Sequence, residues 1–505
     1  MSAVVPPGVS AHTLSEAIAA LADALGAGAV VTDHDELLGF RDPYTYRESG
    51  EFDASAMVMP ASTEQVQAVV RIANRYRLPL WAFGQGRNNT YGGPAPRLRG
   101  SVIVNLRAMD RVLEVNERLA YAVVQPGVRW FDLFGELEAR GGTLWTSIPD
   151  LGWGSVVGNS LENGIGYTPQ GDHASNICGL EVVLPDGELL RTGMGAMEGN
   201  AAWHVYPHAF GPQLRGLFQQ SNYGIVTAMG WKLMPRPEAY ACCWVRCRGF
   251  GPLAEVVDAL QGLLLDATIT NFPMATRGME FDDEGNSYLD PASDLWSIRF
   301  ALYGRRSLVD ARFAVCADVF ARIAGAELIR KDFSGTDIDG PATHDERVQR
   351  GIPDMDLLDP ARLPFGADTA HLDFSPVSTC GGDAVVRTEQ LMRSFYERRG
   401  VPYVGGIHFG PRAVLHFSTV FFDPRDEAQA KAAFEGYTAL VHEMAAHGYV
   451  PYRTNLQHMD LVAGQFAFGG HIQRRVAEAI KEALDPNGIL SAGKSGIWPA
   501  SLRQA

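Results

Sequence analysis

Apolar residues recur along this chain with two spacings, and segments of the two kinds alternate through its first half. Between residues 66 and 73 the valines are spaced to form one face of a helix, and Ser62 and Gln65 before them have the spacing of a capping box. Short apolar runs predict strands at 78–83, 101–106 and 119–125, and a second helix is predicted over about 130–140. This alternation predicts an α+β fold.

A predicted hairpin, a longer strand and a proline-rich segment follow. The apolar runs 180–184 and 188–191 flank Pro185-Asp186-Gly187, whose residue types favour a turn between two strands. A longer strand over 224–234 ends at Pro235-Arg236-Pro237, where the prolines interrupt both helices and strand ladders. We therefore place a boundary near Pro237 and expect a first domain over residues 1–236.

The remaining sequence predicts a second α+β domain and a return to the first. Helices are expected at about 253–265 and 308–323, and strands at 297–303, 371–374 and 413–422. A helix over about 427–447 ends at Gly448, and a last amphipathic helix covers about 472–484. These segments place a second domain at 237–448 and a C-terminal return at 449–505.

Length and composition limit the classes of protein to consider. With 505 residues, 46% of them apolar, the chain is too long for a single core. The 43 Lys and Arg against 58 Asp and Glu give a net charge of −15, which opposes binding to nucleic acid and to anionic membranes. The N-terminus has no basic segment followed by an apolar one, and no run of about 18 apolar residues occurs, so a cytoplasmic location is the default expectation. The six cysteines lack paired CxxC spacing and are expected to be buried thiols rather than metal ligands.

The first candidate for chemistry is a glycine-rich loop after a predicted strand, Gly84-Gln85-Gly86-Arg87-Asn88-Asn89. Asn89 stands where a dinucleotide-binding fingerprint has its third glycine, and Gly92-Gly93-Pro94 stands where a helix would begin. A nicotinamide cofactor is therefore not favoured. The loop can instead offer a turn whose exposed backbone N–H groups bind an anion such as a phosphate.

The second candidate is the pair Tyr452 and Arg453, taken together with Tyr91. One fixed guanidinium and two phenolic hydroxyls can hold a single anionic oxygen, such as that of a phenolate. A phenol titrates near pH 10, so binding it ionised at neutral pH requires about 4 kcal/mol of preferential stabilisation. Charge-assisted hydrogen bonds contribute about 1.5–3 kcal/mol each, so the three groups together can meet this requirement. Taken alone, an adjacent Tyr-Arg pair is more often found on the surface of a protein.

Further glycine-rich segments give these candidates a context. Residues 149–159 contain Gly152, Gly154 and Gly158, and the C-terminal stretch 485–498 contains Gly493-Lys494-Ser495-Gly496. With the first loop, these motifs resemble the flavin domain of the vanillyl-alcohol oxidase / p-cresol methylhydroxylase family, and within it the bacterial eugenol-oxidase type. The resemblance runs from about Met57 to Trp498. It implies a two-domain α+β fold of the p-cresol methylhydroxylase (PCMH) type, in which an α+β cap domain covers the ring of a bound FAD.

The same resemblance implies which residues bind FAD. Backbone amides of both glycine loops would lie on the pyrophosphate, and the C-terminal lysine is a further candidate. The cofactor-binding residues implied in this way are Gly84, Gly86, Arg87, Asn88, Asn89, Gly154, Ser155, Gly158, Asn159, Ile225 and Lys494.

A covalent bond to the flavin is also implied. In oxidases of this family the attached histidine follows a Gly-x-Arg segment on a cap strand, which makes His416, after Gly410-Pro411-Arg412, the attachment candidate. Leu415 departs from the family, because relatives often carry a second histidine there. Side chains alternate along a strand, so Ser418 shares a face with His416 and is expected to line the substrate pocket near the ring. On residue statistics alone His416 would be a core histidine.

The reaction that the resemblance implies starts from an ionised para-substituted phenol. Its benzylic carbon loses hydride to flavin N5, and the resulting quinone methide either adds water or loses a proton. Asp150, at the matching position, is expected beside the reacting carbon with a pKa raised by burial, as a base or as a charge that stabilises the flavin. A plain turn role for Asp150 is the alternative. Tyr167 is expected in the substrate pocket, with His173 near it or purely structural.

The expected activity is that of an FAD-dependent oxidase of para-substituted phenols such as 4-alkylphenols, eugenol and vanillyl alcohol, with dioxygen reduced to hydrogen peroxide. Two alternatives keep the flavin: a dehydrogenase whose electrons go to a cytochrome subunit, and a sugar or hydroxy-acid oxidase. A third treats the protein as a non-catalytic binding module. The resemblance further implies a homodimer or a higher homo-oligomer.

Overall fold

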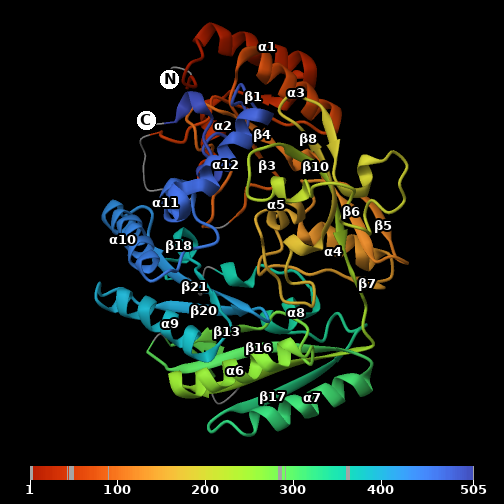
Figure 1. Cartoon of the computed structure of the whole chain (residues 1–505), viewed down its shortest axis with the longest axis vertical. Coiled ribbons are helices and arrows are strands. Elements are labelled where there is room, and N and C mark those ends of the chain that lie inside the picture. The colour runs from red at the N-terminus through yellow and green to blue at the C-terminus, as the bar shows by residue number, and fades with distance from the viewer. Residues whose placement is uncertain are drawn as a thin grey trace.

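A computed structural model describes residues 4–42, 44, 50–88, 90–281, 287–290, 292–359 and 364–503 of the chain. Figure 1 shows two parts: the N-terminal strands and the last helices form the upper part, and the middle of the chain forms a large sheet in the lower part. No helix in these ranges is both long and apolar enough to cross a membrane. All six cysteines are buried and free.

The upper part contains two main sheets. The first has the order β1-β2-β4-β3, with β2, β4 and β3 parallel, and the second is antiparallel with the order β5-β6-β10-β8-β9. The strands are β1 Val30–Val31, β2 Ala56–Val58, β3 Leu80–Phe83, β4 Val102–Asn105, β5 Val112–Asn116, β6 Tyr121–Val124, β8 Ile177–Val183, β9 Leu189–Arg191 and β10 Ile225–Lys232, with the small pair β7 Leu144–Trp145 and β11 Met234–Pro235. The helices are α1 Ala11–Leu25, α2 His34–Leu38, α3 Thr63–Tyr76, α4 Trp130–Ala139 and α5 Val156–Leu161.

Helix α3 illustrates how the sequence pattern produces this part. Ser62 caps the helix by accepting a hydrogen bond from the Gln65 N–H at 3.3 Å, as the capping-box spacing predicts. Its valine face is fully buried against α1 and the first sheet. Each such valine contributes about 1.5 kcal/mol or more through the apolar surface that it removes from water. The predicted hairpin is also confirmed, because β8 and β9 pair antiparallel.

The lower part is built on an eight-stranded sheet with the order β17-β12-β16-β13-β20-β21-β18, and β19 also pairs with β21. Its strands are β12 Ala239–Arg248, β13 Met274–Arg277, β16 Leu295–Gly304, β17 Glu327–Ser334, β18 Ala370–Phe374, β19 Val377–Thr379, β20 Val404–Phe409 and β21 Ala413–Phe422, and a separate pair is formed by β14 Met279–Phe281 and β15 Ser287–Leu289. The helices are α6 Phe250–Leu265, α7 Arg306–Phe320, α8 His344–Arg350, α9 Gly382–Glu397 and α10 Glu427–Ala446. Figure 1 shows α6 and α7 on the lower side of the sheet and α8 on the side of the upper part.

The chain returns to the upper part after α10. Helices α11 Met459–Gln465 and α12 Phe468–Leu484 lead to a segment in which Leu490 forms a parallel bridge with Leu80 on β3. Lys481, fully buried, fixes this return by donating to Asp485 at 2.7 Å and to the Asn222 and Leu490 carbonyls. The division into domains at 1–236, 237–448 and 449–505 remains our proposal.

Candidate functional site

A cleft of about 220 Å³ lies between the two glycine loops of the upper part. It is lined by every cofactor-binding residue inferred above that the structure describes: Gly84, Gly86, Arg87, Asn88, Gly154, Ser155, Gly158, Asn159, Ile225 and Lys494. Asn89 lies outside the described residues. The two loops, far apart in sequence, therefore form one site.

The close approach of the loops explains their small residues. A Cβ on Gly84 would stand 2.5 Å from the Pro126 carbonyl and 2.7 Å from Ser155 Oγ, so only glycine fits. Ser155 Oγ donates to the Pro126 carbonyl at 2.6 Å and accepts from the Gly158 N–H at 2.9 Å, and Asn159 bonds His173 at 2.6 Å. These side chains hold the loops together, and the glycines bring the loop backbone to the wall of the cleft. Such a surface fits the phosphates of a dinucleotide cofactor.

Tyr91, Tyr452 and Arg453 meet at the edge of this cleft. The Arg453 guanidinium carbon lies 4.3 Å from the Tyr91 ring centroid and 5.0 Å from that of Tyr452, and Arg453 Nη2 donates to the Tyr452 hydroxyl at 2.9 Å. The Tyr91 hydroxyl bonds Ser375 Oγ at 2.6 Å. Burial raises the pKa of Tyr91 well above its usual value, although Arg453 opposes this, so its hydroxyl remains a proton donor. The structure thus brings together the three groups that the sequence singled out.

Arg453 retains donors that nothing in the described chain uses. Its Nε and Nη1 are buried, yet neither has a hydrogen-bond partner among the described residues. A buried guanidinium with unused N–H groups favours an anion beside it, because leaving those donors unpaired costs free energy. Arg453 lines a second cavity of about 400 Å³ that shares Tyr91, Gln220 and Lys494 with the cofactor cleft. An anionic oxygen at Arg453 would therefore lie in a cavity that adjoins the cofactor cleft.

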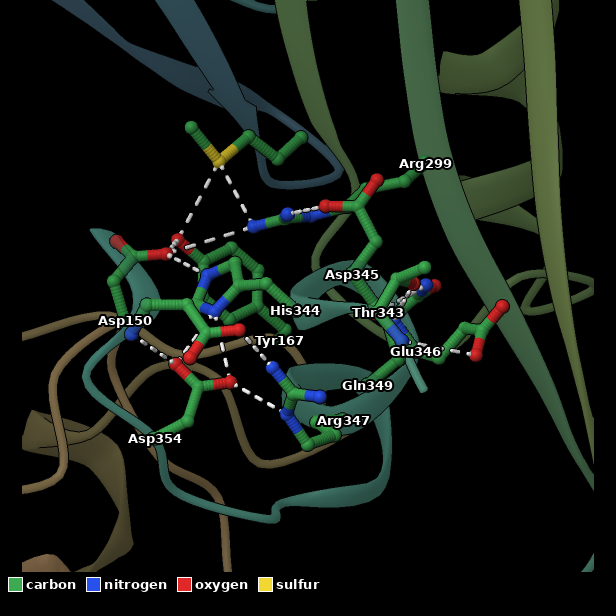
Figure 2. A network of polar contacts seen from close by, with 12 residues as sticks. Asp150, Tyr167, Arg299, Thr343, His344, Asp345, Glu346, Arg347, Gln349 and Asp354 are labelled. Atoms are coloured by element: carbon green, nitrogen blue, oxygen red, sulfur yellow. Dashed lines mark hydrogen bonds and ion pairs between the residues drawn. The ribbon is translucent and has the colours of Figure 1, made fainter. Parts of the chain in front are cut away.

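Asp150 lies in a polar network between the two parts of the fold (Figure 2). Its Oδ1 accepts a hydrogen bond from the Tyr167 hydroxyl and lies 3.3 Å from His344 Nε2 and 3.6 Å from Arg299 Nη2. A backbone bridge from Leu151 to Asp354 holds the Asp150 loop against the lower part of the fold. Asp150 keeps 35% of its side-chain surface accessible, so it is not packed on all sides.

The expectation that the pKa of Asp150 is raised is wrong. Burial does favour the neutral acid, but the hydrogen bond and charge of His344, with the charge of Arg299, outweigh it and lower the pKa to about 2. Burial opposes a charge on His344 as well, yet its bonds to Asp150 and to Asp354, the latter at 2.8 Å, raise its pKa to about 9. At neutral pH the site therefore holds an Asp150 carboxylate beside a protonated His344.

Helix α8 explains how His344 reaches this position. Thr343 caps the helix by accepting from the Glu346 N–H at 3.3 Å, and the Glu346 carboxylate accepts from the Thr343 N–H in return. This capping box fixes His344 and Asp345 in the first turn, where Asp345 pairs with Arg299. The capping residues are readable from the sequence, but nothing local indicates that the helix points at Asp150.

Tyr167 and His173 have different roles in the structure. Tyr167 is buried, with its hydroxyl on Asp150 and the Arg299 guanidinium carbon 4.3 Å from its ring centroid. His173 is fully buried, and its two ring nitrogens bond Asn159 at 2.6 Å and Ser147 at 3.0 Å. Burial lowers the pKa of His173 to about 3. His173 therefore supports the second glycine loop as a neutral residue.

The structure does not bring His416 and Ser418 to the cavity. His416 is fully buried, with Nδ1 2.7 Å from Glu389 on α9 and Nε2 2.8 Å from Ser378, so neither nitrogen is open to a flavin. Ser418, also fully buried, bonds Tyr396 on α9 at 3.0 Å. The two residues do share a face of β21, because side chains alternate between the two faces of a strand. That face, however, packs on the helices. The attachment and pocket roles predicted for them are therefore not supported by the geometry.

Known proteins resemble the chain over its whole length. A family model described as an FAD binding domain matches residues 54–193. The flavoprotein subunit of 4-cresol dehydrogenase (hydroxylating) from Pseudomonas putida is 30% identical over 517 aligned residues, which cover 98% of each chain. The structure of 4-ethylphenol oxidase from Gulosibacter chungangensis in complex with isoeugenol matches with a TM-score of 0.91 at 34% identity, over 99% of this chain and all of that one. The structure of p-cresol methylhydroxylase with substrate bound matches with a TM-score of 0.90 at 29% identity, over 98% of this chain and 99% of the other.

Proposed function

This chain belongs to the PCMH-type family of FAD-dependent oxidoreductases, and on that basis we propose that it oxidises para-substituted phenols at the benzylic carbon. The observation that carries the proposal is the cluster of Tyr91, Tyr452 and Arg453, whose buried guanidinium has two nitrogens without a partner among the described residues. The names of the relatives support it, since they act on 4-cresol and 4-ethylphenol.

The cluster accounts for how the substrate is activated. Arg453 supplies a permanent charge, and the two tyrosine hydroxyls supply donors of hydrogen bonds to a phenolate oxygen. About 4 kcal/mol of preferential stabilisation keeps the substrate ionised at neutral pH, and three charge-assisted bonds are sufficient for it. The ionised oxygen then pushes electron density towards the para carbon and makes its side chain a better hydride donor.

Asp150 acts at the other end of the substrate. Because its pKa is about 2, it is a carboxylate at neutral pH, and Tyr167, His344 and Arg299 hold it in place. A fixed negative charge beside the benzylic carbon stabilises the positive charge that develops there as hydride leaves. The bound flavin supplies the hydride acceptor, and the chain supplies orientation and electrostatics.

We propose dioxygen as the final electron acceptor. The oxidase relative is 34% identical to this chain and the dehydrogenase relative 30%, so the higher of the two identities is to the oxidase. The purified protein should release hydrogen peroxide from 4-ethylphenol and related para-alkylphenols in air, measured with a peroxidase-coupled dye and compared with glycolate and a hexose. Flavin that 4-ethylphenol reduces but air does not reoxidise would favour the cytochrome-linked alternative. Turnover of glycolate or hexose alone would contradict the proposal.

We also propose that the flavin is covalently held, and that His371 rather than His416 holds it. The His371 ring lies 6.0 Å from that of Phe421, which is on the face of β21 opposite to His416. Strand β18, which carries His371, contacts the first glycine loop where the Asp373 N–H donates to Thr90 at 2.8 Å. Within the described residues His371 has no hydrogen bond; its ring packs against Tyr44 at 5.0 Å, and its Nε2 lies 3.9 Å from Asp373.

Acid precipitation tests the attachment directly. Yellow colour should remain with the precipitated wild-type protein and with His416→Ala, and it should pass into the supernatant for His371→Ala. Mass spectrometry of the flavin-bearing peptide identifies the attachment independently. Colour that leaves the precipitate of His416→Ala but stays with His371→Ala would restore the original assignment.

A further inference from the structure

His408, on β20, is a buried histidine that neither the phenolate cluster nor the Asp150 network uses. Its side chain is 3% exposed, and within the described part of the chain neither ring nitrogen has a hydrogen-bond partner. The other buried histidines of this region, His173 and His416, each bond through both nitrogens. Buried polar groups are nearly always paired, so an unpaired imidazole indicates that a partner belongs there.

The surroundings of His408 place that partner at the reacting end of the site. The His408 ring stacks on the Tyr167 ring at a centroid distance of 5.0 Å and an angle of 28°, and the Tyr167 hydroxyl bonds Asp150. Phe272 and Phe417 pack around the same imidazole at 6.2 and 6.4 Å. His408 is therefore held by aromatic rings beside the carboxylate that we place at the benzylic carbon.

His408 lies beside Asp150, and the proposed function places Asp150 and Arg453 at opposite ends of the substrate. A para-substituted phenol whose oxygen lies at Arg453 extends away from it, and only its side chain can reach a residue beside Asp150.

The protonation state of His408 limits what it can bind. Burial lowers its pKa to about 3, against a weaker opposing effect of Asp150, so the ring is neutral at physiological pH. A neutral imidazole has one N–H donor and one acceptor, which together suit a hydroxyl group. A carboxylate at the same place would meet no positive charge on His408 and would be repelled by Asp150.

We propose that His408 selects phenols whose para side chain carries a hydroxyl at the benzylic carbon, by hydrogen bonding that hydroxyl. The inference rests on the proposed function and names a substrate class for it: the benzylic alcohols, in preference to the matching alkylphenols. A site built to hydrogen-bond a substrate hydroxyl discriminates strongly against the analogue that lacks it, because its own polar groups are then left unpaired.

The test compares two substrates that differ by one oxygen, 4-ethylphenol and 1-(4-hydroxyphenyl)ethanol. His408→Phe keeps an aromatic ring on Tyr167 and removes both nitrogens. The ratio of kcat/KM for the alcohol to that for the alkylphenol should fall by about tenfold or more, while kcat/KM for 4-ethylphenol stays within about threefold. The matched control is Phe272→Leu, which changes the packing on the same imidazole without removing a polar group and should leave the ratio unchanged.

Other outcomes would overturn the proposal. An equal loss on both substrates would make His408 a packing residue, and an unchanged ratio would mean that it does not contact the side chain. If His408→Phe does not fold, His408→Asn, which keeps a donor and an acceptor, should retain the preference for the alcohol, and His408→Leu should lose it. Wild-type protein that oxidises neither phenol would instead refute the proposed function, which separates the two failures.

Discussion

Replacing Arg453 by methionine should lower kcat/KM for 4-ethylphenol at neutral pH by about 100- to 1,000-fold. The substrate must be held as a phenolate, which requires about 4 kcal/mol, and each 1.4 kcal/mol lost from the transition state corresponds to about tenfold in rate. Arg453 is the only permanent positive charge of the cluster with Tyr91 and Tyr452. Methionine keeps a long unbranched stem over the Tyr91 ring, so packing changes little.

The pH dependence separates loss of the charge from general damage. Because a free phenol ionises by itself near pH 10, the defect of Arg453→Met should shrink as the pH rises towards that value. Arg474→Met is the matched control, since Arg474 lines the same cavity but is not part of the cluster, and it should stay within about threefold of wild type. Steady-state rates from about pH 6 to 10 measure both variants. A defect that does not change with pH would contradict phenolate stabilisation by Arg453.

Replacing Asp150 by asparagine should slow hydride transfer by about 100-fold or more while leaving the phenol bound as a phenolate. The amide keeps the shape of the side chain but removes the negative charge beside the benzylic carbon. Rapid mixing with 4-ethylphenol in the absence of oxygen measures the step as bleaching of the flavin absorbance. Asp354→Asn is the matched control, because Asp354 also accepts from His344, at 2.8 Å, but is not bonded to Tyr167. The prediction fails if Asp150→Asn reduces its flavin as fast as wild type or if Asp354→Asn is equally slow.

The rate of flavin reduction should also fall at alkaline pH, because His344 loses its proton there. Its pKa is raised to about 9 in the folded protein, so the proton that it shares with Asp150 and Asp354 is present at neutral pH and is lost as the pH rises through about 9. The pair also stabilises the fold fully below the unfolded histidine pKa of about 6.5, and this contribution disappears over the same rise. The rate of flavin reduction should fall above about pH 9 in wild type, and this fall should be absent in His344→Gln.

Helices, caps and hairpins can be predicted from local sequence patterns because interactions between neighbouring residues form them. The valine face of α3, the Ser62 cap and the β8–β9 hairpin each depend on residues close together in the chain, and each is present. Tyr91 and Arg453 are different, since no spacing rule joins positions so far apart. Their meeting was expected only because long motifs in both halves resemble a known family.

The residues that sequence reasoning missed are those whose position is set by the tertiary fold. His344 and Arg299 come from α8 and β16 in the lower part of the fold, and nothing local shows that they face Asp150. Burial of Asp150 was foreseen, but the sign of its pKa shift depends on these neighbours. Without them, burial alone would have raised the pKa of Asp150, as expected.

The assignment of His416 shows a different limit of sequence reasoning. Period two shows which residues of β21 share a face, but not which face looks towards the cofactor. A choice that is wrong by one residue exchanges the whole set. The partly exposed residues Leu415 and Phe417 alternate with the buried His416 and Ser418, so the face opposite to His416 is the less buried one.

The ionisation state of a bound phenol tests the account most directly. A para-substituted phenol without benzylic hydrogen, such as 4-chlorophenol, binds without reacting, and its ultraviolet absorbance distinguishes phenol from phenolate. Titration of the wild-type protein at about pH 7 should show the phenolate band on binding, and Arg453→Met should show the band of the neutral phenol or no binding. A neutral phenol bound to the wild-type protein would contradict the central claim.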